Sequence, residues 1–61
     1  MEIDLIDRVR EALNNAKENG YDQSGLSPRE VAFDLITYDA DLEHEDFCEV
    51  ASAVHIVKMN G

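Results

Sequence analysis

The sequence predicts an all-α protein, a small three-helix bundle, from two observations. Apolar residues recur at the three- and four-residue spacing of amphipathic helices, and clusters of turn-forming residues interrupt that pattern twice. No stretch competes as a strand. Three amphipathic helices with short connections favour a bundle around one core. At 61 residues the chain has room for one domain at most, so we expect a single helical domain over residues 1–61.

The first helix is predicted at about residues 4–19. Its apolar side chains fall within about a third of the helix circumference. Asp4 is expected to cap the start, and Asn19 followed by Gly20 is a good stop, because glycine readily adopts the left-handed conformation that follows many helices. The apolar face consists of Leu5, Ile6, Val9, Ala12, Leu13 and Ala16.

A loop over residues 20–27 leads to the second helix, predicted at about residues 28–39. We expect Tyr21 and Leu26 to anchor this loop to the core. The run Ser27-Pro28-Arg29-Glu30 combines an N-cap serine, a proline at the first helical position and a glutamate three residues after the cap, which is the capping-box pattern. The expected apolar face is Val31, Ala32, Leu35, Ile36 and Tyr38.

The third helix is predicted at about residues 43–58. Asp41 is a plausible cap, Glu43 and Glu45 lie in the expected first turn, and Lys58 lies in the last turn. Acidic residues near a helix start and a basic residue near its end both suit the helix macrodipole. The expected buried face is Phe47, Val50, Ala51, Val54 and Val57.

The charge balance restricts the possible partners. Fourteen acidic residues against five basic ones give a net charge of −9, which argues against direct binding to nucleic acid or to an anionic membrane. Eight carboxylates lie between Glu30 and Val57, where there is no Lys or Arg. Such a surface favours a basic partner protein. The candidate partner-binding residues are Asp34, Asp39, Asp41, Glu43, Glu45, Asp46 and Glu49.

Two interpretations of this acidic half remain open. In the first, the chain is an interaction module that docks on a basic, nucleic-acid-binding protein by charge mimicry. In the second, the acidic face only confers solubility, and the chain is a small helical homodimer of structural function. The expected dimer contact is Phe33, Ala53 and Ile56, although Ile56 can instead cover the first helix.

Metal and catalytic chemistry find little support. The run from Asp39 to Glu43 suggests a calcium loop, but the EF-hand needs glycine at loop position six and glutamate at position twelve, where this chain has His44 and Val50. Cys48 and His55 would lie about 10 Å apart along a helix axis, too far to share one ion. We expect Cys48 to be a small buried residue, and we predict no enzyme activity, metal or cofactor.

The compartment follows from what the sequence lacks. No stretch resembles a signal peptide or a membrane span. Cys48 is the only cysteine, so a disulfide within the chain is excluded. A single unpaired thiol fits a reducing compartment, and we expect the cytoplasm.

Two stretches carry a resemblance. Ser27-Pro28-Arg29-Glu30-Val31-Ala32, followed by the acidic run Tyr38-Asp39-Ala40-Asp41-Leu42-Glu43, resembles small uncharacterised proteins encoded by bacteriophages. The similarity covers about half of the chain. It implies a host-directed inhibitor that binds a host enzyme in the host cytoplasm, and it implies no catalytic residues.

Overall fold

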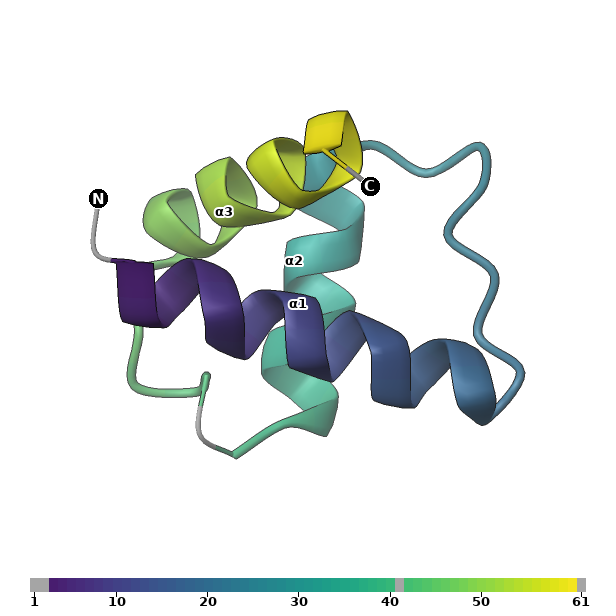
Figure 1. Cartoon of the computed structure of the whole chain (residues 1–61). Coiled ribbons are helices and arrows are strands. Elements are labelled where there is room, and N and C mark those ends of the chain that lie inside the picture. The colour runs from purple at the N-terminus through teal and green to yellow at the C-terminus, as the bar shows by residue number, and fades with distance from the viewer. Residues whose placement is uncertain (1–2, 41, 61) are drawn as a thin grey trace.

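Residues 3–40 and 42–60, which this computed structural model describes, contain three helices and no strand (Figure 1). They are α1 (Ile3–Glu18), α2 (Pro28–Tyr38) and α3 (Phe47–Asn60). α1 and α3 run side by side, and α2 crosses behind them. α3 packs closely against both other helices, whereas α1 and α2 contact each other little. The prediction of a small all-α three-helix bundle is confirmed.

The core lies where the three helices meet, and in the described part of the chain it buries aliphatic side chains only. Burying such side chains supplies the main driving force for folding. The helical periodicity predicted most of these positions. Leu42, in the connection before α3, was not among them, although it is fully buried. The buried residues are Leu5, Val9, Ala12, Leu13, Val31, Ala32, Leu35, Leu42, Val50, Ala51, Ala53 and Val54.

Three side chains that the sequence placed in the core are exposed. Tyr38 is 83% exposed, at the last residue of α2. Phe47 is 36% exposed at the first residue of α3, and Cys48 beside it is also exposed. Both lie in the first turn of α3, before the helix reaches its fully buried positions.

The end of α1 has the predicted stop. Gly20 has a φ of +94°, in the left-handed region. Its N–H donates to the carbonyl oxygen of Lys17 at 3.0 Å, and the N–H of Tyr21 donates to that of Ala16 at 2.9 Å. These two hydrogen bonds form a Schellman motif, which satisfies carbonyl groups that the last turn of a helix would otherwise leave unpaired.

The loop and the start of α2 also follow the prediction. Tyr21 and Leu26 are half-buried against the core, as expected of anchors. Ser27 Oγ accepts a hydrogen bond from the Glu30 N–H at 3.3 Å, which is the N-cap interaction of the predicted capping box. From the last turn of α3, Lys58 Nζ donates to the carbonyl oxygen of Leu26 at 3.0 Å. α2 ends at Tyr38, one residue before the predicted end.

The predicted start of α3 at residue 43 is wrong, because the helix begins four residues later at Phe47. Asp46 is its cap. Asp46 Oδ1 accepts a hydrogen bond from the Cys48 N–H at 3.0 Å, and the Asp46 carbonyl oxygen accepts one from the Val50 N–H at 3.0 Å. The cap therefore fixes where the helix starts.

The connection between α2 and α3 is a series of turns around Leu42. The Leu42 N–H donates to the Asp39 carbonyl oxygen at 3.0 Å, and the Leu42 carbonyl oxygen accepts from the Glu45 N–H at 3.1 Å. The buried Leu42 side chain holds these turns against the core, so they cannot extend α3 backwards. The sequence proposed Asp41 as the cap of α3, and that residue lies outside the described residues.

Ala53 was expected in an exposed dimer contact, and this expectation is wrong. It is fully buried, because α3 packs against two helices and buries a wider part of its circumference than one neighbour would cover. Ile56 is half-buried. Phe33 is 64% exposed on α2. The expected dimer contact therefore does not form one exposed patch.

The capping hydrogen bond at the start of α3 predicts how substitutions of Asp46 change the stability of the fold. Asp46→Ala removes the acceptor for the Cys48 N–H and should lower the free energy of unfolding by about 1 kcal/mol. Asp46→Asn is the matched control, because asparagine caps helices about as well as aspartate and should retain most of the stability. Urea denaturation followed by circular dichroism measures both. Equal stability of the two variants would contradict the cap.

Candidate functional site

The acidic residues that the sequence singled out make different contacts in the structure. Asp34 Oδ2 accepts a hydrogen bond from the Tyr21 hydroxyl at 2.7 Å. Glu45 Oε1 lies 3.1 Å from Nη1 of Arg8 on α1 and forms an ion pair with it. Asp46 caps α3. Asp34 and Glu45 therefore contact residues that are distant in the sequence, whereas Asp46 bonds within its own turn.

The remaining candidates differ in exposure. Glu43 and Glu49 are exposed, on the connection and in the first turn of α3. Asp39 is half-buried at the end of α2. Asp41 lies outside the described residues. Glu43, Asp46 and Glu49 are thus exposed within one short stretch of the chain, whereas Asp34 and Asp39 line a cleft beside α1.

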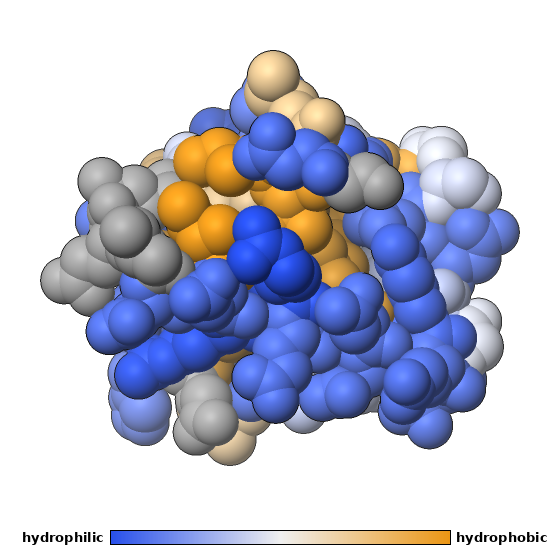
Figure 2. Space-filling view, viewed as in Figure 1, coloured by the Kyte–Doolittle hydropathy of each residue, from blue (hydrophilic) through white to orange (hydrophobic). Residues whose placement is uncertain are grey.

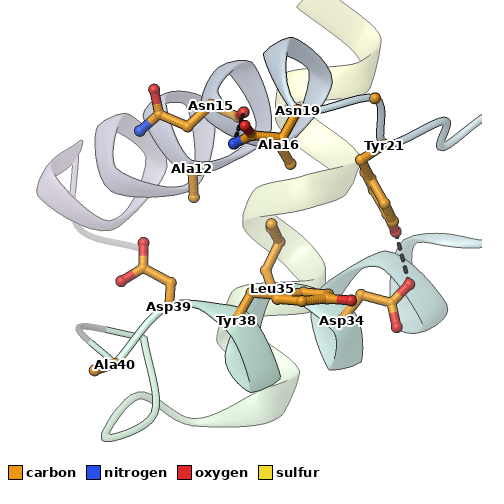
Figure 3. Close-up of a pocket in the computed structure, with 11 residues that line it drawn as sticks. Ala12, Asn15, Ala16, Asn19, Tyr21, Asp34, Leu35, Tyr38, Asp39 and Ala40 are labelled. Atoms are coloured by element: carbon orange, nitrogen blue, oxygen red, sulfur yellow. Dashed lines mark hydrogen bonds between the residues drawn. The ribbon is translucent and has the colours of Figure 1, made fainter.

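A cleft of about 570 Å³ opens between α1 and α2, where Asp34 and Asp39 lie (Figure 3). It exists because the two helices contact each other little and because α1 faces it with small side chains, Ala12 and Ala16. Leu35 contributes the α2 side of its apolar floor. The cleft is therefore a gap between two helices that are held apart.

The polar groups of the cleft are carboxylates, phenols and amides. Asp34 and Asp39 lie at opposite ends, with the Tyr38 ring between them (Figure 3). Tyr38 is the most exposed of the large apolar side chains. On α1, Asn19 Nδ2 donates to the Asn15 carbonyl oxygen at 3.0 Å. Among the described residues that line the cleft, none is basic.

The hydrogen bond between Tyr21 and Asp34 fixes one end of the cleft. Burial raises the pKa of Tyr21 to about 12, and the hydrogen bond to Asp34 and the negative charges of Asp34 and Glu30 add to the shift. The phenol is therefore neutral at physiological pH and remains a donor. A carboxylate has about four acceptor positions, so Asp34 keeps capacity for further donors.

A second cleft, of about 690 Å³, lies on the other face of α1, against the following loop and the end of α3. Its lining includes Arg10, Lys17 and Lys58. Arg10 Nη1 also lies 2.9 Å from Asp7 Oδ1. At 3.6 residues per turn, Arg10 and Lys17 point away from Ala12 and Ala16. The first cleft therefore has only acidic charges among its described lining residues, whereas the second has three basic side chains and one carboxylate, Asp22.

Sequence reasoning missed the cleft between α1 and α2. It treated Tyr21 as an anchor and Tyr38 as a core residue, and it gave Asn15 no role. The only available signal was the pair of alanines, Ala12 and Ala16, on a face shared with Asn15 and Asn19. Small residues at helical spacing leave room beside a helix.

Within residues 3–40 and 42–60, no three or more His, Cys, Asp or Glu side chains gather closely enough to hold a metal ion. His44, Cys48 and His55 are all exposed. In the same residues, every helix is too short or too polar to cross a bilayer.

The tyrosine–aspartate pair predicts a pH dependence. Because the Tyr21 pKa in the folded chain lies above the ordinary value of 10.0, its contribution to stability is complete below pH 10 and is lost as the pH rises towards 12. Asp34→Asn should lower the Tyr21 pKa from about 12 while leaving it above 10, because burial remains. Ultraviolet titration of tyrosinate in a Tyr38→Phe background measures Tyr21 alone. Glu49→Gln is the control, and an equal shift in it would refute the assignment to Asp34.

Comparison of the chain with protein families, with curated proteins and with solved structures found no match. The function proposed below therefore depends on the charges and the clefts of this molecule.

Proposed function

We propose that this chain is a non-enzymatic interaction module that docks on a basic partner protein. The docking surface consists of the end of α2, the connection and the first turn of α3. The observation that carries the proposal is the segregation of charge: eight carboxylates and no Lys or Arg lie between Glu30 and Val57. Glu43, Asp46 and Glu49 are exposed within this stretch.

The contacts that these carboxylates make within the molecule neutralise little of their negative charge. Asp34 is bonded to a neutral phenol, and Asp46 is bonded to a backbone N–H. Glu45 is paired with a cation, Arg8, but both side chains remain partly exposed, and such pairs contribute at most about 1 kcal/mol. A concentrated negative surface attracts a positive partner at a distance and raises the association rate, more than it sets the final affinity.

The spacing of the carboxylates suggests which kind of partner they fit. Side chains three and four apart on a helix lie about 5–6 Å apart at Cβ, similar to the spacing of phosphates along a nucleic-acid strand. Asp46 and Glu49 are three residues apart in the sequence, at the cap and in the first turn of α3. We therefore favour a nucleic-acid-binding protein whose basic groove accepts the acidic surface as a DNA mimic. The resemblance to phage proteins favours a viral origin and a host protein as partner, and the single thiol of Cys48 favours the cytoplasm.

A second candidate function is self-association, and the exposure of Phe33 favours it. A large apolar side chain that is 64% exposed on a regular helix is a plausible contact between two copies. In that case the carboxylates keep a structural homodimer soluble. Ala53 has no part in such a contact, because it is buried in the core.

The docking proposal predicts a salt-sensitive complex. The tagged chain, incubated at low salt with lysate of its host cells, should retain a basic protein that added salt releases. Glu43→Gln combined with Glu49→Gln should weaken its binding about tenfold, because both charges are exposed. Mass spectrometry identifies the captured protein, and a titration of the purified pair measures its affinity.

The matched control for that experiment is Glu11→Gln combined with Glu18→Gln. It removes the same net charge from exposed positions of α1, far from the acidic stretch in sequence. It should bind nearly as well as the unaltered chain. Equal weakening by both pairs would mean that net charge alone attracts the partner, and binding that is insensitive to salt would overturn the electrostatic mechanism.

Self-association has its own test. If two copies meet through Phe33, light scattering should show a dimer that Phe33→Ser converts to a monomer. Thr37→Ser, on the same exposed face, is the control. A monomer at all accessible concentrations would eliminate this candidate.

A further inference from the structure

We propose that the cleft between α1 and α2 takes the guanidinium group of an arginine side chain of the basic partner. The inference rests on the docking function proposed above and identifies where a defined group of the partner binds. It starts from three properties of the cleft: its volume of about 570 Å³, its two carboxylates and its two phenol rings.

The charge of the cleft selects a cation. Asp34 and Asp39 line it at opposite ends, and the described residues around it include no Lys or Arg. An anion would be repelled by both carboxylates. A purely apolar ligand would bring no donor to the acceptor positions that Asp34 keeps beside the Tyr21 hydroxyl, which costs free energy. A cation can donate to Asp34 and gains from the negative charge of the cleft.

The aromatic rings select a planar cation. The Tyr38 ring lies between the two carboxylates and is largely exposed, so its face is available (Figure 3). A guanidinium group stacks on aromatic faces and donates paired hydrogen bonds to carboxylates, whereas an ammonium group is compact and strongly hydrated. The Asn15 and Asn19 side chains on α1 complete a polar rim on the other side.

One carboxylate is already oriented for this contact. The Tyr21 hydroxyl, which is half-buried, donates to Asp34 Oδ2 at 2.7 Å and limits the rotation of the carboxylate. Because Asp34 is already held in place, binding at its remaining acceptor positions avoids the entropy cost of ordering a mobile surface carboxylate. The apolar floor of Ala12, Ala16 and Leu35 suits the methylene stem of arginine.

The two tyrosines give a direct readout. The chain has two tyrosines and no tryptophan, and both tyrosines line this cleft. Tyr21 also lines the second cleft, so the amide resonances of Asn15, Asn19 and Tyr38 assign a change in intrinsic fluorescence to this cleft. The probe is a capped peptide of glycine and lysine with one central arginine. Two matched peptides carry citrulline, which has the same shape without the charge, or lysine in place of the arginine.

We expect the arginine peptide to change the tyrosine fluorescence in a saturable way and to shift the amide resonances of Asn15, Asn19, Tyr21 and Tyr38 of the full chain. The citrulline peptide should do neither, and the lysine peptide should bind more weakly. Tyr38→Ala should weaken binding of the arginine peptide about two- to fivefold, the effect of losing one exposed cation–π contact. Phe33→Ala is the control, because it removes an exposed ring from α2 outside the cleft.

The outcomes separate this inference from the docking function. If the arginine and lysine peptides bind equally and shift resonances near Glu43 and Glu49 only, the cleft inference is overturned while electrostatic docking stands. The cleft inference is also overturned, and electrostatic docking still stands, if the Tyr38→Ala and Phe33→Ala variants bind the arginine peptide equally well. If the captured partner binds the double variant Glu43→Gln with Glu49→Gln as tightly as the unaltered chain, the docking function is refuted. If the captured partner binds the Tyr38→Ala variant more weakly and the Phe33→Ala variant unchanged, the result supports the cleft inference.

Discussion

The position of α3 between the other two helices determines most of what this molecule presents to its surroundings. Its buried surface extends over Val50, Ala51, Ala53 and Val54, so α1 and α2 both pack against it (Figure 1). A chain of 61 residues has only a marginal core, and these contacts supply much of it. Figure 2 shows the apolar side chains gathered between α1 and α3 and surrounded by hydrophilic ones. Since both neighbours are held by α3, they are kept apart from each other, and the acidic cleft is the space that remains.

Local sequence signals predicted the parts of the fold that depend on local interactions. Serine at the cap and glutamate three residues later marked the start of α2. Asp46 and Glu49 have the same spacing at the start of α3, and that signal was overlooked because Asp41, in the acidic run before it, was taken as the cap. Leu42, a single apolar residue among carboxylates, has no periodicity to mark it as buried. Its burial depends on how the connection crosses the core, which local spacing does not encode.

The candidate site was predicted only in part, for a related reason. The carboxylates are visible in the sequence, but their partners are not. Glu45 pairs with Arg8 from 37 residues away, and Asp34 pairs with Tyr21 from 13 residues away. In both contacts a connecting segment meets a helix: Tyr21 lies in the loop after α1, and Glu45 lies in the connection before α3. Periodicity placed Tyr38 in the core. Tyr38 is instead the last residue of α2, and its side chain is exposed there. This exposed ring is what gives the cleft its aromatic wall.

The placement of charge along α3 has a consequence for the approach of another molecule. The helix begins beside Asp46 and Glu49 and ends beside Lys58, and Lys58 shares its surroundings with Arg10 and Lys17. The molecule therefore has an electric dipole moment in addition to its net charge. In the field of a positively charged body, a torque acts on such a dipole and turns its negative pole forward before any contact forms. Productive collisions are then more frequent than random tumbling would allow.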